Sequence, residues 1–373
     1  MMIPPIDPTQ LSTPAQKILS DGAPPKLKLM AARGIVPGVR PEEVLCVMVL
    51  LAGAEDPELA DTAQTALADL PGPLLQGALQ ADLHEAVITV LADSYLHNVP
   101  VLEKLVQMPR LPVEAVLHLA EYGGEGTTEL VATNQELLLA HPEIIERLYL
   151  NKATRMSTAD RLVELAVRNG IELQGIAAWK EVAQAIQGEL IVEPTEEPLP
   201  DDELFWETDE LAHELSDEGL EDVFFEDDEG EELLEDKLKP LHARISEMTI
   251  SQKIRRAMLG TREERAMLIR EQNKIVASAA ARSPLLQEPE VVQITRNRGV
   301  SVEVLRIIGM TAEWLKSYQV KKNLVENAKT PIAISQRLIT QLRESDLRRI
   351  AKSKNIPGAV QMQARRHLQR RKR

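Results

Sequence analysis

The chain has 373 residues but only one cysteine, three phenylalanines and 3% aromatic residues. A single thiol cannot build a disulfide framework, a zinc ribbon or a Cys-ligated iron–sulfur cluster within one chain. The scarcity of aromatic and β-branched runs favours helices over a β-sandwich or barrel. We therefore predict an all-α fold, long enough for two domains, in a reducing compartment.

Long hydrophobic runs are also missing. The longest extends from Val44 to Ala52, which is nine residues, whereas a helix needs about 20 to cross a bilayer. The N-terminus lacks the basic and apolar regions of a signal peptide. We expect a soluble, cytoplasmic protein with no membrane contact.

Lys and Arg are absent from residues 193–236, which contain 22 acidic residues. Residues 237–373 carry 30 Lys and Arg against 11 acids, while residues 1–192 carry 13 against 25. Such asymmetry indicates separate units with separate partners. The predicted organisation is a Pro-rich N-terminal arm (1–40), a helical-repeat module (41–188), an acidic, largely disordered linker (189–240) and a basic helical-repeat module (241–373).

Helix starts are marked in both modules. Pro-Glu pairs recur before apolar helical patterns, for example at Pro41-Glu42 and Pro142-Glu143. Proline suits the first helical position and glutamate suits the positive end of the helix dipole. The phrase TREE (261–264) has capping-box spacing, with Thr261 as the cap and Glu264 reaching back. Helices this short are marginal alone, so we expect them to pack side by side.

A loose repeat runs through the C-terminal part. Asparagine recurs at 273, 297, 327 and 355, with gaps of 24, 30 and 28 residues. Asn297 and Asn327 open related phrases, NRGVSVEV and NAKTPIAI, and weaker echoes occur at HNVPVLEKL (97–105) and NKATRMSTADRL (151–162). Periods of this length suit two-helix repeats stacked into a solenoid.

The phrases around Asn297 and Asn327 resemble HEAT-like and leucine-rich-variant helical repeats of bacterial proteins. The resemblance implies a binding scaffold and no particular ligand. Leucine-rich-variant proteins can carry an iron–sulfur module, but this chain lacks the cysteines for one.

We find no catalytic, cofactor or metal signature. GGEGTTE (123–129) has glutamate at position 129, where a dinucleotide-binding phrase needs its third glycine, and it lacks a phosphate-loop ending. His84-Glu85 begins a zinc-protease phrase, but Ile88 stands where the second histidine belongs. Cys46 lies in an apolar pattern typical of a buried, inert thiol. We therefore expect a non-enzymatic protein without cofactor or metal, although a site assembled from scattered residues stays open.

Large apolar residues lie within the acidic segment. Phe205 with Trp206, and Phe224 with Phe225, form two aromatic nodes among the acids. Such a pattern is typical of a docking peptide, in which acids steer the encounter and aromatic rings supply contact energy. These four residues are our predicted partner-binding set, and the basic C-terminal module is the nearest surface for them. A disordered acidic tract with incidental apolar residues is the open alternative.

Cations cluster in the C-terminal module. Lys253, Arg255 and Arg256 form one cluster. The predicted anion-binding set comprises Arg348, Arg349, Lys352, Lys354, Arg365, Arg366, Arg370, Arg371, Lys372 and Arg373. Clustered cations neutralise phosphates with release of counterions, but no base-reading motif accompanies them.

The sequence thus predicts a scaffold that binds another protein. The alternative is a nucleic-acid-associated protein that contacts the phosphate backbone through its basic C-terminal module and is autoinhibited by the acidic linker.

Overall fold

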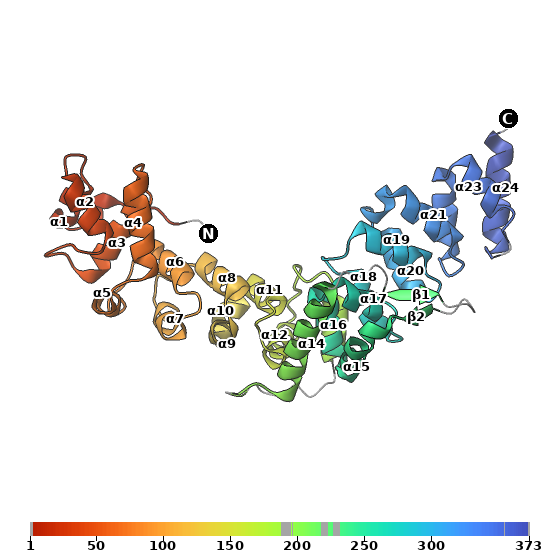
Figure 1. Ribbon diagram of the computed structural model, residues 1–373, viewed down its shortest axis with the longest axis horizontal. Helices are drawn as coiled ribbons and strands as arrows, with labels where there is room; N and C mark the ends of the chain where they lie inside the picture. The colour runs from red at the N-terminus through yellow and green to blue at the C-terminus, as the bar shows by residue number, and fades with distance from the viewer. Residues whose placement is uncertain are drawn as a thin grey trace. The chain divides into compact units, whose positions relative to one another are not determined.

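The structure, a computed structural model, describes residues 3–187, 195, 197–217, 223–226, 232–353 and 355–371. These residues form 24 α-helices, four short 3₁₀ helices and one hairpin of two three-residue strands (Figure 1). The predicted all-α fold is confirmed. No helix in the described part of the chain is both long and apolar enough to span a membrane.

The chain divides into two compact units, Met1–Leu162 and Val163–Arg373. The division lies within helix α12 (Met156–Arg168) and differs from the boundary that composition suggested over 189–240. The reason is that α13 (Trp179–Ile186) packs against α16 (Ile250–Leu259) and α18 (Lys274–Ala281). A change in charge therefore does not mark the change in packing.

The first unit consists of short helices whose apolar faces pack on their neighbours. Helices α3, α6, α8 and α11 contact one another in succession, and α7 and α9 pack beside them. The bounds are η1 (Pro8–Gln10), α1 (Thr13–Leu19), α2 (Pro25–Ala32), α3 (Pro41–Ala52), α4 (Pro57–Ala68), α5 (Gly72–Ala78), α6 (Glu85–Ser94), α7 (Val99–Leu105), α8 (Val113–Tyr122), α9 (Glu125–Ala132), α10 (Gln135–Ala140) and α11 (Pro142–Leu150).

Residues 1–40 are more than a Pro-rich arm. Helices α1 and α2 lie within this range and both contact α3. Each has proline at its first or second position, where a missing N–H costs no helical hydrogen bond. The prolines here start helices instead of extending the chain.

The second unit contains two rows of helices. Helices α16, α18, α20, α22 and α24 contact in succession, and so do α17, α19 and α21. The bounds are α14 (Pro200–Asp217), β1 (Phe224–Glu226), β2 (Glu232–Leu234), η2 (Asp236–Leu238), α15 (Lys239–Glu247), α17 (Arg262–Leu268), α19 (Glu288–Arg296), α20 (Val302–Met310), η3 (Trp314–Lys316), α21 (Tyr318–Glu326), α22 (Ile332–Leu338), η4 (Ile339–Gln341), α23 (Glu344–Ile350) and α24 (Gly358–Arg371).

The capping signals of the sequence determine several of these starts. Thr261 caps α17 and Glu264 closes the box, as TREE predicted, with the Thr261 N–H donating to Glu264 Oε2 at 2.7 Å. Thr249 and Gln252 form a second box at the start of α16. Gly260 is the residue at which α16 ends, and the Thr261 box starts α17 immediately after it.

Part of the segment expected to be a disordered linker is helical. Helix α14 occupies Pro200–Asp217, and residues 232–240 enter β2, η2 and α15. Strand β1 pairs antiparallel with β2. Residues 188–194, 196, 218–222 and 227–231 of this segment lie outside the described residues.

Candidate functional site

Helix α14 begins with strong local signals. The Asp202 carboxylate accepts a hydrogen bond from the Leu199 N–H at 2.8 Å, and Pro200 is the first helical residue. Three acids in the first turn face the positive end of the helix dipole. We expected disorder because of the charge repulsion and the prolines in this segment, but proline and acidic residues also suit the first turn of a helix.

One face of α14 is buried. Asp202, Phe205, Thr208 and Ala212 are each at most 1% exposed and follow helical spacing. The acids Glu203, Glu207 and Glu210 are exposed. The helix is therefore amphipathic, with an aromatic ring at the centre of its buried face.

Phe205 lies against two buried arginines of α16. The Cζ atoms of Arg255 and Arg256 are 4.9 and 5.0 Å from its ring centroid. Both arginines are 0% exposed. A guanidinium over a desolvated ring gains about 2 kcal/mol or more from cation–π attraction, so Phe205 is the principal anchor of α14.

Arg256 also joins three helices through charge. It makes a two-pronged contact with Glu264 of α17, Nε to Oε1 at 2.7 Å and Nη2 to Oε2 at 2.6 Å, and its Nη1 lies 2.7 Å from Asp209 Oδ1 of α14. Burial acts to lower the pKa of Arg256, but the charges and hydrogen bonds of Glu264 and Asp209 outweigh burial and raise it. Arg256 therefore stays cationic and holds α14 to α17.

Two further contacts secure the helix at its margins. Gln252 Nε2 of α16 donates to the Asp201 carbonyl oxygen at 3.2 Å. Arg244 of α15 lies 3.2 Å from Glu207. The latter pair is exposed on both sides and contributes about 0–1 kcal/mol, so the buried contacts dominate.

The other predicted aromatic residues are placed differently. Trp206 follows Phe205 on α14 and is only half-buried. Phe224 and Phe225 lie in β1, in register with Leu234 and Leu233 of β2, but their side chains lie outside the described residues. The ring of Phe205 is thus placed against the basic module, between Arg255 and Arg256.

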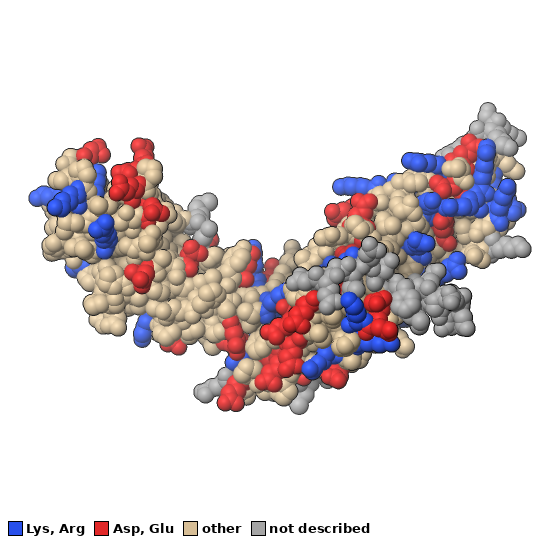
Figure 2. Space-filling view, in the orientation of Figure 1, with Lys and Arg blue, Asp and Glu red and all other residues tan. Residues whose placement is uncertain are grey.

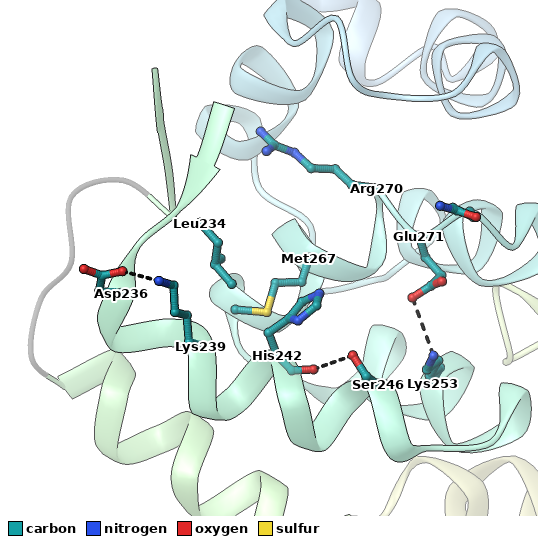
Figure 3. Close-up of a pocket in the computed structure, with 10 residues that line it drawn as sticks. Leu234, Asp236, Lys239, His242, Ser246, Lys253, Met267, Arg270 and Glu271 are labelled. Atoms are coloured by element: carbon teal, nitrogen blue, oxygen red, sulfur yellow. Dashed lines mark hydrogen bonds and ion pairs between the residues drawn. The ribbon is translucent and has the colours of Figure 1, made fainter. Parts of the chain in front are cut away.

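A pocket of about 710 Å³ lies beside α15, α16 and α17 (Figure 3). Lys239 is paired with Asp236 at 2.6 Å and Lys253 with Glu271 at 3.6 Å, while Leu234 and Met267 lie between the two pairs. The lysines are therefore already neutralised by neighbours. In the described part of the chain, no group of three or more His, Cys, Asp or Glu residues is placed to hold a metal.

The predicted C-terminal anion-binding residues divide into two groups. Arg348 pairs with Glu344 at 2.5 Å, Arg349 pairs with Glu326 and Asp346, and Arg365 donates to the Ala351 carbonyl oxygen. Arg348, Arg349 and Arg365 are nevertheless exposed, as are Lys352, Arg366 and Arg370. Figure 2 shows Lys and Arg gathered over α21, α23 and α24, and Asp and Glu gathered over α14. Lys354, Lys372, Arg373 and the Arg371 side chain lie outside the described residues.

The cluster at residues 253–256 is not the solvated basic face that its sequence suggests. Arg255 and Arg256 are fully buried beneath α14, so they cannot meet phosphate while α14 is in place. The sequence signal that was missed is the combination of Phe205 and Asp209, four residues apart on one helical face, with Glu264 in a capping box.

A scan against protein-family models matched no family, and a search of curated proteins found no match.

Proposed function

We propose that this chain is a non-enzymatic, cytoplasmic helical-repeat scaffold that binds other proteins, and that the surface of α16 and α17 receives an acidic amphipathic helix. The observation that carries the proposal is the seat of Phe205 between Arg255 and Arg256. In this chain the seat holds α14, and a partner helix with the same chemistry competes for it.

The chemistry of the seat favours this class of partner. It offers a flat ring site and a buried guanidinium that needs a carboxylate one helical turn from the ring, as Asp209 is from Phe205. Acids elsewhere on the helix steer it toward the basic C-terminal module, and the ring provides the final contact energy. The seat therefore selects an acidic helix with one aromatic anchor.

Because α14 belongs to the same chain, its contact with the seat is intramolecular and it competes at a high effective concentration. An external helix then binds weakly unless α14 is displaced. Displacement of α14 is the step that makes the seat available to a partner.

The test uses the full chain and a fluorescein-labelled peptide with the sequence of residues 200–217. The double variant Phe205→Ala/Asp209→Asn weakens α14 in its seat and leaves the seat intact, so peptide affinity should rise at least tenfold over the wild type. Glu203→Gln/Glu210→Gln, on the exposed face of α14, is the matched control and should change affinity less than threefold. A folded double variant that fails to bind the peptide more tightly contradicts the proposal.

A further inference from the structure

Three connections between helices lie at one edge of the second unit. The Asn327 side chain at the end of α21 donates to the Thr295 and Asn297 carbonyl oxygens at the end of α19, at 3.0 and 2.9 Å. These two helices therefore run parallel, with their C-terminal ends together. The chain leaves this edge after each helix to enter α20 and α22.

Helix α23 continues the same arrangement. At the helix starts, Tyr318 Oη of α21 donates to Asp346 Oδ2 of α23 at 2.5 Å. At the helix ends, Arg349 of α23 pairs with Glu326 of α21. Helices α21 and α23 are thus also parallel, and the connection to α24 begins at the same edge.

Each of the three connections carries an exposed cation: Arg298, Lys329 and Lys352. Within the described residues, none of these three side chains has a recorded hydrogen bond or ion pair. Helices α19 and α21 pack together, so Arg298 and Lys329 are separated by roughly the 8–10 Å typical of packed helices. The Arg349–Glu326 ion pair joins α21 to α23, whose following connection carries Lys352. We call this row of three cations the basic edge.

Their position just after helix C-termini gives these cations a modest stabilising role. A cation just past a helix C-terminus interacts favourably with the helix dipole, which contributes about 0.3–1 kcal/mol at an exposed position. That role requires no alignment between helices. A dipole does not explain why three cations, none with a partner among the described residues, stand one at each of three neighbouring connections.

We propose that the basic edge binds the phosphodiester backbone of a nucleic acid. A polymer with a charge on every unit can meet a row of cations and gains from counterion release at each contact. With 3% aromatic residues the chain offers few stacking platforms, so recognition is of phosphate and not of base sequence.

An acidic peptide is the competing ligand class. Val302 and Ile332 begin α20 and α22 and are 46% and 48% exposed, so an acidic apolar peptide finds some contact here. However, the basic edge lacks the feature that holds α14 in place, namely buried guanidinium groups that contact an aromatic ring. Regular spacing without an anchor favours a uniform polyanion.

The test measures fluorescence anisotropy of the full chain with labelled single-stranded and duplex DNA of about 20 units, across a salt series from about 50 to 200 mM. The variant Arg298→Gln/Lys329→Gln/Lys352→Gln should weaken binding at least tenfold at the lowest salt. The slope of log affinity against log salt should fall by about 2 for single strands and about 3 for duplex, since each contact adds about 0.7 or 0.9. The comparison of the two slopes and affinities identifies which form is preferred.

The matched control is Lys17→Gln/Lys26→Gln/Lys104→Gln, which removes the same charge from exposed positions of the first unit. It should change affinity less than twofold. The conservative variant Arg298→Lys/Lys352→Arg should retain binding, and far-UV circular dichroism with thermal unfolding checks that each variant is folded.

Three outcomes would overturn the inference. These are no saturable binding of either DNA at the lowest salt, equal losses in the control and basic-edge variants, or tighter binding of labelled polyglutamate than of DNA. The inference goes beyond the proposed protein-binding seat and can fail separately, because the basic-edge variant should leave the binding of the 200–217 peptide unchanged.

Discussion

The side-chain amide of Asn327 donates a hydrogen bond to the backbone carbonyl oxygen of Asn297 at 2.9 Å. Its carbonyl oxygen accepts from the Lys329 N–H at 3.0 Å, and Asn297 Oδ1 accepts from the Gly299 N–H at 2.5 Å. Each asparagine side chain thus accepts a hydrogen bond from the backbone two residues further on, just after the end of its own helix. Asn327 in addition satisfies the buried Asn297 carbonyl at the end of α19.

Replacement of Asn327 by alanine should lower the free energy of unfolding by about 1–3 kcal/mol, because it leaves buried carbonyl oxygens without a donor. Urea denaturation followed by circular dichroism measures the change. Asn355 belongs to the same sequence series but is exposed, so Asn355→Ala should cost less than about 0.5 kcal/mol. Equal losses in the two variants would show that the bridging amide has no special weight.

The recurring asparagines are evident in the sequence, but their roles in the structure could not be predicted from it. Asn151 in the first unit repeats the Asn327 geometry, donating to the Ala120 and Gly123 carbonyl oxygens at 3.0 and 2.9 Å. Asn273 instead caps the start of α18 by accepting from the Ile275 N–H. Spacing identifies a connection between helices, whereas the hydrogen-bond partner depends on which helix lies alongside.

Local capping signals could be predicted from the sequence, whereas contacts between distant residues could not. The capping box of Thr261 and Glu264 lies within four residues and was predicted correctly. The burial of Arg256 depends on Glu264, eight residues away, and on Asp209, 47 residues away. A cluster of cations whose partners lie elsewhere in the sequence cannot be distinguished, from the sequence alone, from a solvent-exposed basic face. Arg298 and Lys329 were overlooked because they are isolated in sequence and come together only when the helices pack side by side.

Loss of the Glu264 carboxylate should destabilise the second unit strongly. Glu264→Ala leaves Arg256 buried with Asp209 as its remaining carboxylate partner, and breaking a buried pair in this way typically costs about 3–5 kcal/mol. Chemical denaturation of the full chain measures the loss. The double variant Arg256→Met/Glu264→Leu should recover part of it, because it removes both charges together. A double variant no more stable than Glu264→Ala would contradict this account.

The ionised Asp346 carboxylate should stabilise the fold near neutral pH, and this contribution should be lost in acid. Burial acts to raise the pKa of Asp346, but the Tyr318 hydrogen bond and the charges of Lys322 and Arg349 outweigh it and lower the pKa below its ordinary value. A carboxylate with a lowered folded-state pKa contributes stability above its unfolded pKa and loses it as pH falls through the folded value. Asp346→Asn should therefore destabilise the protein at pH near 7, and its difference from the wild type should shrink as pH falls below about 4.

Urea unfolding at several pH values measures that convergence. Asp61 is exposed on α4, so Asp61→Asn should change the free energy of unfolding by less than about 0.5 kcal/mol at any of them. A constant difference between Asp346→Asn and the wild type across the acid range would contradict the role given to Asp346.

The single thiol should be almost unreactive in the folded protein. Burial raises the pKa of Cys46 to about 11 from 9.0, and the charges of Glu43 and Glu42 add to the effect. At a fixed pH below both values, this shift lowers the thiolate fraction about a hundredfold, before any hindrance from burial is counted. Iodoacetamide should accordingly modify the native chain more than a hundredfold more slowly than the chain in guanidinium. Glu43→Gln should accelerate the native reaction, since it removes a negative charge that disfavours the thiolate, and Cys46→Ser gives the background rate. Native labelling within tenfold of the unfolded rate would mean that Cys46 is reached by solvent and that the packing of α3 around it is looser than described.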